Sequence, residues 1–236
     1  MKKIAFTLSA IVMVFIAATL SASAQSIESR QVARFNHIGS TGPFTVHVKI
    51  DGTESLKISA QPDVIPFIET FVEDSILQIK FKDNLKDGQG DSDRPIDIYV
   101  TAKSLTSVAN IGSGSVNVDG NVTGSDVRIV LDGAGTIQSS IKSGNLQVMM
   151  RGAGRVRLNG TADKAKIVII GAGEMNSRNL KTKDASVVIK GAGNVYFGAD
   201  KTVSANIVGA GSVYYSGNAT VTDKYVNGAG GVSKID

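Results

Sequence analysis

Hydrophobic and polar residues alternate along the second half of the chain, around a glycine triplet that recurs seven times. The triplet reads Gly-Ser-Gly or Gly-Ala-Gly, and its copies begin at residues 112, 133, 152, 171, 191, 209 and 228. The position two residues after each triplet is always apolar: Val116, Ile137, Val156, Met175, Val195, Val213 and Val232. The positions two and four residues before it are mostly apolar as well. Alternation with a period of two is typical of β-strands that bury one face.

The spacing of the triplets predicts how these strands are arranged. The intervals between first glycines are 21, 19, 19, 20, 18 and 19 residues. A unit of about 19 residues cannot bury its own apolar face, so neighbouring units must stack on one another. No unit contains a run long enough for the helix of a helical repeat. We therefore predict an all-β fold, a parallel β-helix with one repeat per coil. The fixed period favours it over the alternative, a β-sandwich with glycine-rich turns.

The two outer glycines of each triplet are predicted to be structural. They fall on the inward parity at a corner of the coil, where glycine permits a positive φ or a close backbone approach that a Cβ would forbid. The set comprises Gly112, Gly114, Gly133, Gly135, Gly152, Gly154, Gly171, Gly173, Gly191, Gly193, Gly209, Gly211, Gly228 and Gly230.

The chain divides into three predicted parts: residues 1–24, residues 25–101 and the triplet-bearing β-helix of residues 102–236. The middle part has no triplets, but its alternating apolar positions predict short strands that cap or continue the solenoid. One stretch has helical spacing instead, because Val64, Phe67, Ile68 and Phe71 fall on one side of a helix. We expect a short helix there, N-capped by Asp63, closing the open end of the solenoid.

The first 24 residues have the pattern of a signal peptide. Lys2 and Lys3 precede an uncharged apolar run over residues 4–20, and Ala22-Ser23-Ala24 matches a cleavage site. The alternative is an uncleaved anchor, but the run is at the short end of a membrane-spanning length. We predict cleavage after Ala24 and a mature chain with no membrane span. The exported protein would be periplasmic, secreted or on the cell surface.

Composition removes several kinds of chemistry from consideration. The chain has no cysteine, which excludes disulfides, thiolate catalysis and cysteine-based metal sites, and only two histidines. Without Lys2 and Lys3 it carries 23 basic and 21 acidic residues, a balance that gives no reason to expect a nucleic-acid partner. No cofactor or metal is predicted, because the residue two positions after each triplet is apolar where a calcium-binding turn needs Asp. The acidic stretch with Asp87, Asp91 and Asp93 is interpreted as a solvated loop, with a weakly bound cation as the alternative.

Taken together, the export signal, the strand-rich start and the serial Gly-Ser/Ala-Gly-x-Val coils resemble the head GIN domain family of adhesin-type bacterial envelope proteins. The resemblance covers about residues 32–232 and is most specific in the triplets and in the stretch Val213-Tyr214-Tyr215-Ser216-Gly217. It implies a right-handed parallel β-helix and an adhesive role at the cell surface or in the periplasm. It implies no catalytic residues, because the family has none assigned.

A polar row is predicted on the outer surface, three residues after each triplet. It consists of Asn117, Gln138, Arg157, Asn176, Tyr196 and Tyr214. Such side chains, repeated about every 4.8 Å, suit an extended polymer such as a glycan, and Tyr and Arg are enriched at binding hot spots. We therefore predict that Arg157, Asn176, Tyr196 and Tyr214 bind a glycan or an envelope or host protein. An ordinary solvated sheet face is the alternative.

A second outer row is largely apolar and lies three residues before each triplet. It consists of Ala109, Val130, Met149, Val168, Val188, Asn206 and Tyr225. Exposed apolar strips generally mark covered surfaces or interfaces. We expect the N-terminal segment or a second copy of the chain to cover this one, so a homo-oligomer through the strip is one prediction.

Many β-helices are polysaccharide lyases or hydrolases, so catalysis has to be considered. Asp132, Arg151 and Lys190 precede triplets and are expected to stack in one outward row. A hydrolase requires two carboxylates at a set separation, and no acidic pair recurs in adjacent coils. We predict a non-enzymatic binding module, with a polysaccharide-active enzyme as the alternative.

Overall fold

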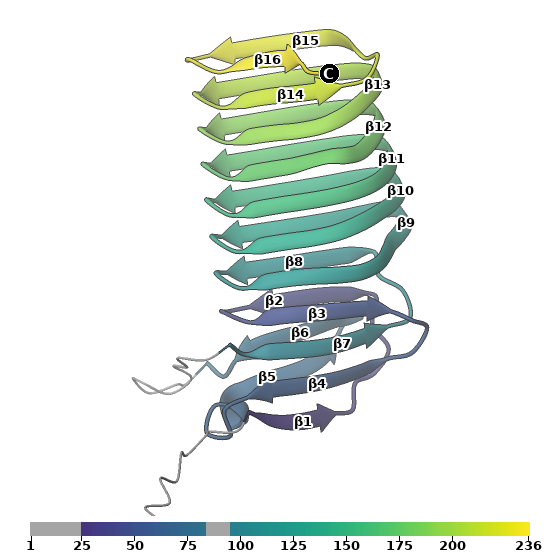
Figure 1. Ribbon diagram of the computed structural model, residues 1–236, viewed down its shortest axis with the longest axis vertical. Helices are drawn as coiled ribbons and strands as arrows, with labels where there is room; N and C mark the ends of the chain where they lie inside the picture. The colour runs from purple at the N-terminus through teal and green to yellow at the C-terminus, as the bar shows by residue number, and fades with distance from the viewer. Residues whose placement is uncertain (1–24, 84–94) are drawn as a thin grey trace, which may run out of the picture.

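The computed structural model describes residues 25–83 and 95–236, and these residues form one continuous sheet wound into a solenoid (Figure 1). The predicted signal peptide and the acidic loop with Asp87, Asp91 and Asp93 lie outside the described residues. From β9 to β13, each strand makes one coil and pairs in parallel with the next. Their bounds are β9 (Ser115–Gly133), β10 (Thr136–Gly152), β11 (Arg155–Gly171), β12 (Glu174–Gly191) and β13 (Asn194–Gly209). The predicted parallel β-helix is confirmed.

Each coil has two long faces that meet at the glycine triplet. The post-triplet face contains the first part of each coil, and the pre-triplet face contains its last part. Along both, every second residue points inward, as with Val156, Ile167 and Ile169, which are fully buried. Stacking these positions from coil to coil builds one continuous apolar core. The alternation of apolar and polar residues in the sequence therefore predicts which side chains point out to solvent.

The two glycines of a triplet occupy different environments. Gly171 has φ +119°, and a Cβ built there would overlap the carbonyl oxygen of Gly152 in the preceding coil. Gly154, the second glycine of its triplet, is buried, and a Cβ there would lie 2.6 Å from Leu131 Cδ2. The middle residue Ala172 is exposed, and its N–H donates to Gly152 O over 2.9 Å. Only the second glycine is thus inside the coil, whereas the first lies on the corner itself.

The N-terminal segment adds coils to the solenoid in an order that differs from the chain order. β2 (His37–Thr41) and β3 (Thr45–Ile50) turn at Gly42 and pair in parallel with β8 (Ser107–Gly112) and β9. The other edges of β2 and β3 pair in parallel with β6 (Ile76–Phe81) and β7 (Asp97–Ala102). The later pair β6–β7 therefore lies beneath the earlier pair β2–β3 in Figure 1.

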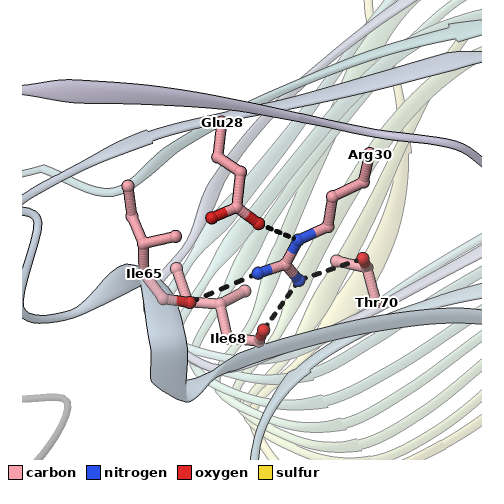
Figure 2. A network of polar contacts seen from close by, with 5 residues as sticks. All are labelled: Glu28, Arg30, Ile65, Ile68 and Thr70. Carbon is pink, nitrogen blue, oxygen red and sulfur yellow. Dashed lines mark hydrogen bonds and ion pairs between the residues drawn. The ribbon is translucent and has the colours of Figure 1, made fainter.

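Antiparallel strands end the stack at this side. β1 (Ser26–Arg30) pairs with β4 (Ser55–Ala60), β4 pairs with β7, and β5 (Ile68–Glu73) pairs with β6. Figure 2 shows how Arg30 joins β1 to the region of β5. Its guanidinium donates to the carbonyl oxygens of Ile68 and Ile65, over 2.7 and 3.3 Å, and to Thr70 Oγ1 over 3.1 Å. Glu28 Oε1 accepts from Nε at 2.6 Å, so a single side chain satisfies backbone groups at the end of the solenoid.

The helix predicted around residues 63–71 is wrong in extent. The structure has a single 3₁₀ turn, η1 (Ile65–Phe67), and the chain becomes strand β5 at Ile68. Val64 is the N-cap residue and no side chain caps the turn, so Asp63 does not have the predicted role. The segment from Ile68 instead satisfies its backbone by pairing with β6, which leaves Phe71 36% exposed. Sheet pairing has overridden a local helical pattern.

The C-terminal end is built from three shorter strands. They are β14 (Ser212–Ser216), β15 (Thr220–Asn227) and β16 (Gly231–Lys234), and they continue the parallel pairing on β13 and on β14. In the part of the chain that the structure describes, no helix has the length and apolarity needed to cross a membrane.

Candidate functional site

The predicted polar row lies on the post-triplet face. We call it the polar ladder: Asn117, Gln138, Arg157, Asn176, Tyr196 and Tyr214, one from each successive coil. Gln138 is in register with Asn117 and Arg157, and Tyr196 with Asn176 and Tyr214. Because adjacent strands are about 4.8 Å apart, neighbouring ladder side chains can contact one another. The structure therefore brings all four predicted binding residues onto one surface.

Tyr196 and Tyr214 form the aromatic end of the ladder. Their ring centroids are 4.7 Å apart and their planes differ by 10°, so the rings lie face to face. Arg178 places its guanidinium carbon 4.3 Å from the Tyr196 ring centroid, a cation–π contact. The stack hides the facing ring surfaces, and both tyrosines are half-buried. The far face of Tyr214 lies toward the next coil, where its register partner is the small residue Ser233.

A shallow cavity of about 320 Å³ adjoins this stack. It is lined only by amide and guanidinium side chains: Gln138, Arg157, Asn159, Asn176, Arg178 and Asn179. Asn176 is oriented by donating to Glu174 Oε1 over 3.2 Å, and Glu174 also pairs with Arg155 over 3.6 Å. Arg157 is exposed and, among the described residues, makes no ion pair. The cavity thus offers hydrogen-bond donors and acceptors together with a cation available to a ligand.

The ladder extends into the N-terminal segment. This extension was not predicted from the sequence. His47 is in register with Asn117 on one side and with Tyr99 on the other, and Tyr99 with Lys57. The His47 and Tyr99 rings are stacked, with centroids 4.9 Å apart and planes 15° from parallel. His47 Nε2 also lies 3.0 Å from Asp97 Oδ1.

A signal for this extension is present in the sequence. Gly42 is followed four residues later by Val46 and preceded four residues earlier by Ile38, the same offsets that surround a triplet. Phe44 stands where the second glycine would be, so the triplet itself cannot be recognised.

The apolar strip lies on the pre-triplet face, and Ala109, Val130, Met149, Val168 and Val188 are half-buried there. The expectation that the N-terminal segment covers this strip is wrong for the described residues. Those residues extend the stack instead (Figure 1), because their strands satisfy their hydrogen bonds by pairing with the sheet edge. A second copy over the strip stays a prediction.

The charged row considered for catalysis contains an ordinary surface ion pair. Arg151 Nη1 lies 3.6 Å from Asp132 Oδ2, and both side chains are exposed. Ile170 separates Arg151 from Lys190 in the register. In residues 25–83 and 95–236, no group of three or more His, Asp or Glu side chains is placed to hold a metal ion.

This architecture places the chain among the parallel β-solenoid proteins. The polar ladder runs along its post-triplet face. A family model described as "Putative auto-transporter adhesin, head GIN domain" matches residues 34–219. The chain belongs to that family, as the triplets suggested.

Solved structures share the fold over nearly the whole chain. A protein described as a putative adhesin from Bacteroides fragilis is 24% identical, with a TM-score of 0.77, over 90% of this chain and 99% of the other. A protein from Parabacteroides distasonis described as a putative lipid binding protein is 20% identical, with a TM-score of 0.73, over 91% and 98%. A putative adhesin from Parabacteroides merdae is 20% identical, with a TM-score of 0.70, over 91% and 98%. Comparison with curated proteins gives no significant match.

Proposed function

We propose that this protein is an exported, non-enzymatic adhesin of the bacterial envelope that binds a glycan along its post-triplet face. The polar ladder carries the proposal, because it joins an aromatic stack to a cavity lined by amides and guanidinium groups. The adhesin description of the family is consistent with a binding role. Export would follow from the signal peptide predicted over residues 1–24.

The chemistry of the ladder matches that of a glycan. Sugars present hydroxyl groups that both donate and accept, which suits the amides of Gln138 and Asn176 and the phenols of the tyrosines. Sugars also present apolar C–H faces, which pack against aromatic rings. The far face of Tyr214, above Ser233, is the ring surface available for that contact. The backbone of the ladder is held by strand pairing, and the stacked tyrosines are already ordered by their mutual contact, so these rings lose little entropy when a ligand binds.

The double variant Tyr196→Ser/Tyr214→Ser tests this proposal. We expect it to weaken glycan binding by more than about 1 kcal/mol, the loss typical of a hot spot, because it removes both phenols and the available ring face. A glycan array identifies the ligand, and isothermal titration calorimetry measures the affinity. The β-sheet circular dichroism signal should stay nearly unchanged.

Tyr225→Ser is the matched control, because Tyr225 is 53% exposed on the pre-triplet face. It should bind like the unmodified protein. If the double variant binds normally and Val168→Asp abolishes binding instead, the site lies on the apolar strip. Turnover of a bound glycan that is lost in Asp132→Asn would replace the binding proposal by the enzyme alternative.

A further inference from the structure

The stacked rings of Tyr196 and Tyr214 form one aromatic platform on the post-triplet face. A second aromatic platform lies at the N-terminal end of the same face. The stacked rings of His47 and Tyr99 form it, and Tyr99 is 48% exposed. It borders a groove with a volume of about 690 Å³. The groove is lined on this face by His47, Lys49, Lys57, Tyr99, Asn117 and Gln138, among others. Gln138 also lines the cavity beside the tyrosine stack, so the two hollows lie on either side of this one side chain.

Positive charge exceeds negative charge along these hollows. Lys49, Lys57 and Arg157 are exposed, and the described part of the chain offers none of them an ion pair. Asp119, in register with Lys49, offsets one of these charges. The carboxylates of Asp97 and Glu174 are already engaged by His47 and by Arg155. The groups free to meet a ligand are therefore mainly cations and neutral donors, which complement carboxylates.

The spacing of the two platforms defines the shape of the ligand. From His47 the ladder passes through Asn117, Gln138, Arg157 and Asn176 to Tyr196, which is five steps from coil to coil. Consecutive members are register partners except Arg157 and Asn176, where the pairing of β11 with β12 is irregular. At about 4.8 Å per step, the platforms are about 24 Å apart along the solenoid axis. A compact ligand cannot touch both, whereas a linear polymer lying parallel to the axis contacts every coil between them.

We propose that the post-triplet face binds a linear, carboxylate-bearing polysaccharide aligned with the solenoid axis, with its two ends on the His47–Tyr99 and Tyr196–Tyr214 platforms. This inference rests on the proposed glycan-binding function and specifies its ligand class. Lys57 and Arg157 pair with carboxylates of the polymer, while Gln138 and Asn176 bind hydroxyl groups between the platforms. Engaging both platforms with one chain multiplies their separate affinities.

Calorimetry with oligogalacturonides of graded length provides the test. Chains longer than about 24 Å should bind at least about tenfold more tightly than the disaccharide, because only they reach both platforms. Tyr99→Ser/Lys57→Gln should weaken binding of the long chains at least about fivefold and leave the disaccharide bound at the tyrosine stack unaffected. Fully methyl-esterified chains of the same length, which lack the carboxylates, should bind more weakly.

Tyr225→Ser/Lys142→Gln is the matched control, since both residues are exposed away from the groove. It should behave like the unmodified protein. Equal affinity for long and short chains, or for the esterified chains, would overturn the inference. So would an unaffected Tyr99→Ser/Lys57→Gln variant. If the Tyr196→Ser/Tyr214→Ser variant still weakens binding of a glycan in those cases, the proposed function stands without its extension; if no glycan binding depends on either platform, both fail.

Discussion

Replacing Gly171 by valine is expected to lower the free energy of unfolding by about 2–4 kcal/mol. The position has φ +119°, a conformation that L side chains rarely adopt, and any Cβ would overlap the carbonyl oxygen of Gly152. That oxygen accepts the N–H of Ala172, so moving it away would also break the hydrogen bond that joins two coils at the corner. A β-branched side chain leaves no rotamer that relieves the overlap.

Urea denaturation followed by circular dichroism measures this change, with Ala172→Ser as the matched control. Ala172 is exposed, so the added hydroxyl should change stability by less than about 0.5 kcal/mol. Similar losses at the two positions would mean that the corner geometry is not what requires glycine there.

The triplet-bearing coils could be predicted from the sequence because the interval between triplets sets the register of neighbouring coils. Each glycine corner lies directly over the corner of the preceding coil, as Gly171 lies over Gly152, so a constant sequence interval becomes a constant spatial stack. In the N-terminal segment this correspondence fails. Gly42 stacks on Gly112, yet 70 residues separate them in the sequence, and the β6–β7 coil lies beneath β2–β3 although it follows them in the chain. Local periodicity carries no information about such distant pairing.

The misassigned helix has a related cause. Val64, Phe67, Ile68 and Phe71 satisfy a helical period, but over so short a run the same residues are compatible with a turn followed by a strand. Residues 68–73 form a strand and not a helix because they pair with the edge of β6. A local pattern cannot show that such an edge is present.

Part of the candidate site could be predicted from the sequence because it follows the triplet repeat. Tyr196 and Tyr214 follow triplets at one offset in neighbouring coils, and that offset is enough to predict that their rings meet. His47 and Tyr99 meet in the same way, but they come from β3 and β7, which no repeat aligns. The sequence also could not show that stacking would hide the ring faces, which depends on ring orientation.

Replacing Phe197 by alanine is expected to lower the free energy of unfolding by about 3–5 kcal/mol. Phe197 is 1% exposed and is among the largest fully buried side chains in the described residues. It follows Tyr196 directly in β13, with the opposite parity, and its register partner Tyr215 is also buried. Truncating it leaves a cavity that is not readily filled, because β14, which carries Tyr215, is held by its pairing with β13 and with β16.

Tyr196→Ser is the matched control for this prediction, measured by the same urea denaturation. Tyr196 points outward, so its loss removes only the contact with Tyr214 and with Arg178, and we expect less than about 1.5 kcal/mol. The comparison also bears on function. If Tyr196→Ser proved as destabilising as Phe197→Ala, the tyrosine stack would be holding the solenoid together. Weaker glycan binding in the tyrosine variants would then reflect damage to the fold. A small effect on stability combined with a large effect on binding would show that the ladder tyrosines bind the ligand and do not act by stabilising the fold.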